Sequence, residues 1–238
     1  MGMRATTIRF SEDLWQLLDR EAQRQGVSAA QFLRESALLR LGAASARGDE
    51  APAGRADRSA DVSRQLADGS RLAALRATGM LDSPPAPAFD RLTRLASRFL
   101  NAPVALVSLI DADRQYFKSC LGLPEPWASR RETPLSHSFC QYVVARREPL
   151  IVSDAREHPE LRESLAIRDL DVVAYAGVPL IDRAGHVLGS LCAIDAQPRL
   201  WSSQQVDTLR DLAETAVAAI ELESERSQRS AAVRGDAH

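Results

Sequence analysis

The segment "SHSFCQ" contains two residues that could do chemistry together. His137 and Cys140 are three positions apart, so a helix would bring both to one face. There they could hold a metal, haem or bilin group, or a neighbouring imidazolium and a helix N-terminus could activate the Cys140 thiolate. The alternative is structural, with Cys140 as a small buried apolar residue and His137 as a hydrogen-bonded polar one. We favour the structural interpretation, because a metal needs further ligands and His158 and His186 occur in loop-like sequence.

The remaining sequence offers little further catalytic chemistry. The three cysteines, Cys120, Cys140 and Cys192, are too few and too scattered for a disulfide scaffold or a CxxC metal site. Walker, nucleophile-elbow and HExxH motifs are absent from the sequence. Asp111 and Asp113 favour a turn rather than an acid pair. We therefore expect no catalytic residue, no metal site and no enzymatic activity.

The composition is that of a globular protein. The chain has 238 residues, of which 45% are hydrophobic and 26% charged, with a net charge of −2. This length suits one ordinary domain and a small one. Because the net charge is small, any contact with nucleic acid must come from a local patch. The start "MGMRATT" lacks an apolar signal segment, and no apolar run approaches the roughly 20 residues of a membrane span. We expect a cytoplasmic protein with no membrane partner.

Residues 1–42 form the first of four expected regions. Residues 6–10 alternate between apolar and polar, which is typical of a strand. Ser11 is a suitable N-cap for a helix that ends at Gly26, and Ser28 caps a second helix. A strand and two helices of this length have too little core to fold alone. We therefore expect two copies to pair their strands antiparallel and to share the four helices.

The stretch "TTIRFSEDL" and the "GVS" turn resemble the ribbon-helix-helix family of DNA-binding proteins over residues 4–42. The resemblance implies a dimer whose paired strands enter the major groove of double-stranded DNA, while a helix N-terminus binds phosphate. The residues that it assigns to DNA binding are Arg4, Ala5, Thr7, Arg9, Ser28 and Ala29. Ala5 is a weak reader where the family often has a polar or basic side chain, so Arg4 would assist. A dimerisation tag and an antitoxin-type partner domain are the alternatives for this region.

Two segments, residues 43–69 and 226–238, contain few residues that could form a core. Residues 43–69 are rich in Ala, Gly, Asp, Arg and Ser, which predicts a flexible linker, with a helix beginning only near Ser63. The apolar pattern returns over residues 70–225. Residues 226–238 are polar, and we expect a disordered tail.

The pattern over residues 70–225 indicates an α+β domain with an antiparallel sheet flanked by helices. "SPPAPAFDRLTRLASRFL" is a helix with prolines in its first turn. "APVALVSLID" and "RQYFKSC" form one hairpin, and "AYAGVPLID" and "HVLGSLCAID" form another. "PLIVSD" is a further strand. "LSHSFCQYVVA" and "SSQQVDTLRDLAETAVAAIELESE" complete the domain as helices.

The pieces "LDSPPAPAFDRLTRLASR", "VALVSLIDADRQYFKS", "ETPLSHSFCQYV" and "YAGVPLIDRAGHVLGSLCAID" resemble the GAF domains of bacterial sensor proteins. The resemblance implies a ligand between the sheet and the loops over it. The implied pocket residues are Arg114, Lys118, His137, Phe139, Cys140, Asp154 and Tyr175. The family hosts many ligands, so the small molecule, if one binds, is unknown. Haem and bilin are not expected, because tetrapyrrole-binding members have other sequences around their cysteine.

Together these regions predict a transcription regulator in which a GAF sensor modulates dimerisation or DNA binding. GAF domains tend to pair through flanking helices, here residues 63–78 and 202–225, so we expect a homodimer or a dimer of dimers. The linker favours control through association or spacing rather than through a continuous helix. The alternative is a non-catalytic interaction module, antitoxin-like or a signalling adaptor. A thiol-dependent GAF enzyme is the weaker third reading, since the three cysteines do not match the paired cysteines of the family's methionine sulfoxide reductases.

Overall fold

The computed structural model describes residues 20, 23, 28–29 and 53–235. The chain separates into two units, Met1–Gly54 and Arg55–His238. In the first unit, Ala29 is helical and Ser28, immediately before it, is not. The predicted DNA-reading strand, with Arg4, Ala5, Thr7 and Arg9, lies outside the described residues, and so do residues 43–52 of the predicted linker.

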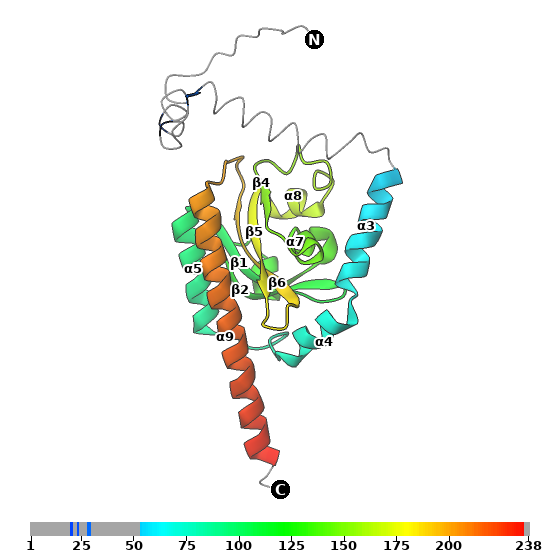
Figure 1. Cartoon of the computed structure of the whole chain (residues 1–238), viewed down its shortest axis with the longest axis vertical. Coiled ribbons are helices and arrows are strands. Elements are labelled where there is room, and N and C mark those ends of the chain that lie inside the picture. Colours follow the sequence, from blue (N-terminus) through cyan, green and yellow to red (C-terminus); the bar gives the residue numbers. More distant parts are fainter. Residues whose placement is uncertain (1–19, 21–22, 24–27, 30–52, 236–238) are drawn as a thin grey trace. The chain divides into compact units, whose positions relative to one another are not determined.

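One antiparallel sheet forms the centre of the second unit (Figure 1), with the strand order β3-β2-β1-β6-β5-β4. Its strands are β1 Val104–Ile110, β2 Arg114–Leu121, β3 Glu132–Pro134, β4 Leu150–Val152, β5 Ala174–Ile181 and β6 Val187–Asp195. The predicted hairpins β1–β2 and β5–β6 both form, and β1 also pairs with β6. At the first hairpin turn, the Asp111 amide donates to the Arg114 carbonyl at 2.9 Å. The predicted α+β architecture is confirmed.

Helices lie on both sides of this sheet (Figure 1). They are α3 Ala53–Leu66, α4 Gly69–Ala77, α5 Pro87–Leu100, α6 Trp127–Arg130, the 3₁₀ turn η1 Leu135–His137, α7 Cys140–Arg146, α8 Leu165–Leu170 and α9 Ser203–Gly235. The helices α5 and α9 contribute to one apolar core, and α3, α7 and α8 contribute to the other. Side chains alternate along a strand, so β1 serves both: Val107 and Leu109 enter the first core, and Leu106 and Ile110 the second.

The segment predicted as a linker differs from expectation where it is described. The helix α3 begins at Ala53 rather than near Ser63. It does not continue into α4, because the Asp68 carboxylate caps α4 by accepting a hydrogen bond from the Arg71 amide at 2.7 Å. Among residues 60–69, whose burial the structure describes, two large apolar side chains, Val62 and Leu66, are buried in the second core. Because the segment has so few apolar residues, its composition resembles that of a flexible linker although part of it is helical.

The helix α9 also continues into the segment predicted as a disordered tail. It ends at Gly235 and extends past the sheet and α5 (Figure 1). Exposed ion pairs stabilise this extension at helical spacing, between Arg226 and Glu223 at 3.2 Å and between Arg229 and Glu225 at 3.5 Å. Within the described part of the chain, no helix is long and apolar enough to cross a membrane.

Candidate functional site

A small polar cluster lies inside the second apolar core, between the sheet and α7. Cys140 is the first residue of α7 and Cys192 belongs to β6; both are buried, and their Sγ atoms are 3.8 Å apart. The Tyr175 hydroxyl donates to the Cys140 Sγ at 3.2 Å, and the Ser190 Oγ lies 3.5 Å from the same hydroxyl. We call these four residues the thiol cluster.

A missing side chain on β5 fixes the direction of Tyr175. Gly177 is two residues further along the strand, so it faces the same side of the sheet as Tyr175. A Cβ atom at position 177 would lie 2.2 Å from the Tyr175 hydroxyl oxygen. The ring can therefore lie along the strand only because residue 177 is glycine. Phe139 packs edge-on against the same ring, with centroids 5.5 Å apart.

A second chain of buried polar side chains borders the thiol cluster. The Gln115 Nε2 donates to the Ser108 Oγ at 3.3 Å, and the Ser138 Oγ donates to the Gln115 Oε1. The Ser138 Oγ also accepts from the Gln141 amide at 3.1 Å. Unpaired polar groups in an apolar core cost free energy, and this chain supplies the partners that remove the cost. It also anchors the start of α7 to β1 and β2.

The protonation of the cluster is uneven. Burial raises the pKa of the Cys192 thiol and of the Tyr175 hydroxyl. Hydrogen bonds from Cys192 and Tyr175 to the Cys140 sulfur favour its thiolate and lower the pKa of Cys140. Cys140 is therefore the group of this cluster that ionises first.

His137 makes no described hydrogen bond to the Cys140 sulfur, although both residues line one small cavity. It belongs to η1, and its Nε2 pairs with the Asp169 carboxylate at 3.0 Å. Its ring also packs on Trp127, with centroids 5.0 Å apart. The Arg168 guanidinium and His137 together lower the pKa of Asp169 to about 2. These contacts agree with the structural interpretation of His137.

A cavity of about 20 Å³ is lined by two members of the thiol cluster, Cys140 and Tyr175, and not by Cys192. Four of the seven predicted pocket residues line it, namely His137, Phe139, Cys140 and Tyr175. A cavity needs about 10–15 Å³ to hold one water molecule, so this one accommodates little more. A haem, bilin or nucleotide would enter only after the side chains around it had moved.

Two of the predicted pocket residues bind the loop before α5 instead. The Arg114 guanidinium pairs with the Asp82 carboxylate at 2.6 Å. The Lys118 ammonium donates to the Ser83 Oγ at 2.5 Å and to the Pro84 carbonyl at 2.8 Å. Desolvation lowers the pKa of Lys118. Both side chains thus hold the entry to α5, remote from the contacts of the thiol cluster.

The last predicted pocket residue, Asp154, pairs with Arg156 two residues later, at 2.6 Å, and does not line the cavity. Three further residues build the site: Gln115 and Ser138, which lie within the segments predicted to hold the pocket, and Cys192, which was not predicted to lie there. A polar residue within a buried strand was the available signal for Gln115. For Cys192, strand alternation alone left the direction of its side chain open.

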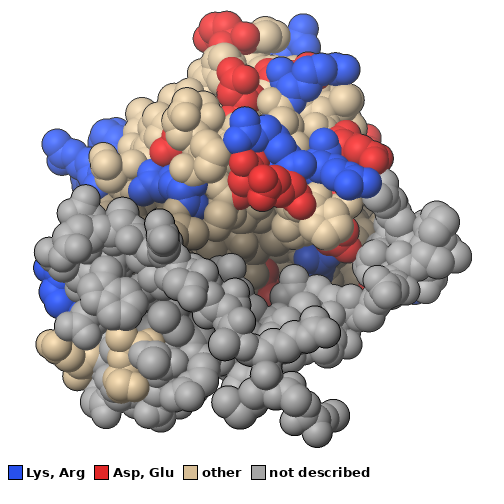
Figure 2. Space-filling model, turned by 90° about the horizontal axis from the view of Figure 1, so that it is seen from above, with Lys and Arg blue, Asp and Glu red and all other residues tan. Residues whose placement is uncertain are grey.

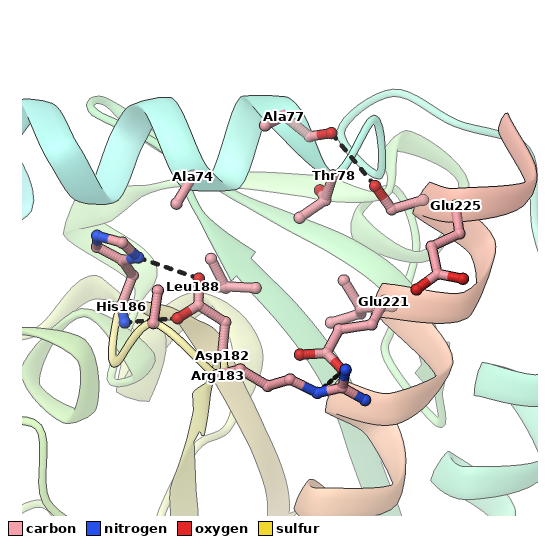
Figure 3. A pocket seen from close by; sticks show the side chains of 12 residues that line it. Ala74, Ala77, Thr78, Asp182, Arg183, His186, Leu188, Glu221 and Glu225 are labelled. Carbon is pink, nitrogen blue, oxygen red and sulfur yellow. Dashed lines mark hydrogen bonds and ion pairs between the residues drawn. The ribbon is translucent and has the colours of Figure 1, made fainter. Parts of the chain in front are cut away.

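A larger cavity of about 390 Å³ lies between α4, α9 and the β5–β6 turn (Figure 3). His186 pairs with Asp182 at 3.1 Å, and Arg183 pairs with Glu221 at 2.9 Å. Figure 3 shows both pairs at the cavity wall. The side chains of Asp182, Arg183 and His186 already have partners, so we take the buried thiol cluster as the stronger candidate site.

Comparisons with known proteins agree with this architecture. A family model described as the GAF domain matches residues 84–220. A cyclic di-GMP phosphodiesterase of Pseudomonas aeruginosa is 34% identical over 131 residues, which are 55% of this chain and 22% of that protein. The matched region thus spans about a fifth of the length of this curated relative, namely 22%.

One solved structure shows the same fold at low sequence identity, and a second is reported beside it. The GAF domain from an Acinetobacter phosphoenolpyruvate-protein phosphotransferase has a TM-score of 0.50 and 18% identity, with 68% of this chain and 99% of that chain covered. The GAF-B domain of DevS from Mycobacterium smegmatis has a TM-score of 0.48 and 17% identity, with 61% and 99% covered.

Proposed function

The chain belongs to the GAF domain family, and on this premise we propose that its GAF domain is the sensor of a sequence-specific, DNA-binding transcription regulator. The expected input is a small signal at the core beside α7, and the expected output is DNA binding by residues 1–42. No catalytic role is proposed. The phosphodiesterase activity in the name of the Pseudomonas relative is not part of the proposal, but a similar region in a signalling enzyme supports a sensory role.

The packing of α3 carries this proposal. This helix connects the N-terminal segment to the sensor domain, and its Val62 and Leu66 are buried in the same core as Phe139, Cys140 and Tyr175. Suppose that this core has two packings and that a ligand or a modification favours one of them. The signal would then shift α3 from its position in one packing to its position in the other. Since residues 53–66 are helical, at most residues 43–52 remain for the predicted linker. A change in the packing of α3 is therefore a further route by which the sensor domain could control DNA binding, besides association of chains and the spacing between domains.

Two surface features support the other parts of the proposal. On the described surface seen in Figure 2, acidic and basic side chains are interspersed, which favours placing DNA contacts in the N-terminal unit rather than on that face. The homodimer or dimer of dimers would pair through the predicted flanking segments, residues 63–78 and 202–225. The second of these contains the apolar side chain of Leu222, which is 49% exposed.

Replacement of Arg9 by Ala is expected to abolish selection of a specific DNA sequence. The full chain is incubated with a pool of random duplexes at two salt concentrations, and the bound duplexes are sequenced. The unchanged protein should enrich a short inverted or tandem repeat, with affinity that falls steeply as salt rises. Arg24→Ala removes the same charge outside residues 6–10 and serves as the matched control, so it should retain the enrichment.

The same experiment separates the alternative function. A chain that forms a stable dimer but enriches no sequence at either salt concentration contradicts DNA binding. That result favours a protein-interaction module. The interspersed acidic and basic side chains in Figure 2 are also compatible with a protein partner.

A further inference from the structure

We propose that Cys140 and Cys192 form a reversible disulfide when the protein meets hydrogen peroxide, so that the core beside α7 senses an oxidant. Hydrogen peroxide would be the signal of the proposed sensor. Only the effect of the disulfide on DNA binding rests on the proposed function. The chemistry depends on the thiol cluster alone. Three observations carry the inference: the distance between the sulfurs, the cavity beside one of them, and the hydrogen bond from Tyr175.

The two sulfurs are already close. Their separation is 3.8 Å, and a disulfide bond is about 2.05 Å long, so they must approach by about 1.8 Å. Cys140 is the first residue of α7 and Cys192 lies in the central strand β6. A small shift of the first turn of α7 toward the sheet, with side-chain rotation, closes this gap.

The cavity decides which oxidant reaches which sulfur. It borders Cys140 and not Cys192, and its volume is about 20 Å³. Hydrogen peroxide is only slightly larger than water, whereas an organic hydroperoxide would require the lining to open. Leu123 and His137, which are partly exposed, form part of the wall. Cys140 is therefore the thiol that reacts with the peroxide, and Cys192 is the thiol that completes the disulfide.

The reaction balances without another cofactor. The Cys140 thiolate attacks one oxygen of the peroxide, the O–O bond breaks, and a sulfenic acid and a hydroxide form; the hydroxide takes up the proton that Cys140 released on ionising and becomes water. The Cys192 sulfur then attacks the sulfenic sulfur, the S–O bond breaks, and the hydroxide leaves with the Cys192 proton as a second water. The two thiols lose two electrons, and the peroxide is reduced to two waters. A dithiol reductant restores both thiols by exchange.

Tyr175 links the oxidation to the surrounding core. Its hydroxyl donates to the Cys140 sulfur in the reduced protein, and this hydrogen bond changes when the sulfur moves toward Cys192. Val143 and Val144 of α7 share the core with Leu66 of α3. A bond between α7 and β6 would therefore change the packing under α3, the helix that leads to the N-terminal segment.

Cys120 provides an internal control. It is half-buried, its sulfur lies 4.0 Å from the Ala128 carbonyl, and burial raises its pKa. Cys140 and Cys192 contact each other, whereas Cys120 has no sulfur partner among the described contacts. The Cys120→Ser variant should thus oxidise like the unchanged protein.

Peptide mapping of the oxidised full-length chain tests the inference. The reduced protein is treated with hydrogen peroxide under native conditions, the free thiols are alkylated, and the protein is digested without reduction. We expect a cross-linked peptide pair that contains Cys140 and Cys192 and that dithiothreitol separates. The Cys192→Ser variant should stop at a Cys140 sulfenic acid, which dimedone traps when the oxidised protein is unfolded in its presence, and Cys140→Ser should leave Cys192 reduced.

The opposite results would overturn the inference. These are no cross-link between Cys140 and Cys192, a cross-link that forms only in denaturant, or one that requires Cys120. Failure of the sensor chemistry and failure of the proposed output are distinguishable. A disulfide without DNA selection leaves the oxidant sensor intact and removes the transcriptional output. DNA selection without a disulfide removes the oxidant sensor and leaves the transcriptional output intact.

Discussion

Replacement of Arg71 by Met is expected to lower the free energy of unfolding by about 2–5 kcal/mol. The Arg71 side chain is buried, and its two terminal nitrogens donate to the Ile110 carbonyl at 2.6 Å and to the Leu66 carbonyl at 2.5 Å. These bonds join the end of α3, the helix α4 and the end of β1. Methionine preserves most of the stem but donates no hydrogen bond, so both buried carbonyls lose their side-chain partner. Chemical denaturation of the full chain measures the loss.

The control for this prediction lies on the same helix. Arg76 also belongs to α4, but its side chain is 63% exposed and makes only a 3.7 Å ion pair with Asp111. Arg76→Met should change the free energy of unfolding by less than about 0.5 kcal/mol. Equal small effects of the two substitutions would show that the buried guanidinium does not hold this corner together.

Replacement of Gly189 by Ala is expected to cost about 3 kcal/mol of stability. Gly189 lies on β6 opposite Leu109 of β1. A Cβ atom there would be 1.9 Å from the Ser108 carbonyl oxygen and 2.9 Å from the Leu109 Cα. Both contacts are with backbone, which cannot rotate away as a side chain can. The two central strands must separate locally, and this weakens the ladder that positions both cores.

The same substitution at Gly69 is the matched control. Gly69 begins α4, and a Cβ atom there would meet nothing within 4 Å. Since alanine reduces the conformational entropy of the unfolded chain, Gly69→Ala should be neutral or stabilise by about 0.5 kcal/mol. Thermal or chemical unfolding of both variants gives the comparison. Similar stabilities would mean that β1 and β6 tolerate the added methyl group.

Local signals predicted most of the sheet and the helix α5. The hairpins β1–β2 and β5–β6 follow from apolar runs separated by short polar turns. Pro87 at the first position of α5 and an apolar stripe of period 3.6 predicted that helix. Each signal acts between residues that are near in sequence, so no knowledge of the remaining chain was required.

The part of α3 before Ser63 and the last turns of α9 escaped prediction. Their stability comes from contacts that composition does not reveal. In α3, Val62 and Leu66 enter a core built by distant segments. In α9, exposed ion pairs such as that of Arg229 with Glu225 extend a helix already anchored elsewhere.

The candidate site shows the same division. The sequence by itself determined the GAF-like order of elements and drew attention to His137 and Cys140, because their types and spacing are local properties. Only the tertiary structure decided their partners. His137 pairs with Asp169, whereas Cys140 meets a thiol 52 residues away on β6. The side that Cys192 faces depends on the register between β1, β5 and β6, and a shift of one residue would turn it to the other core.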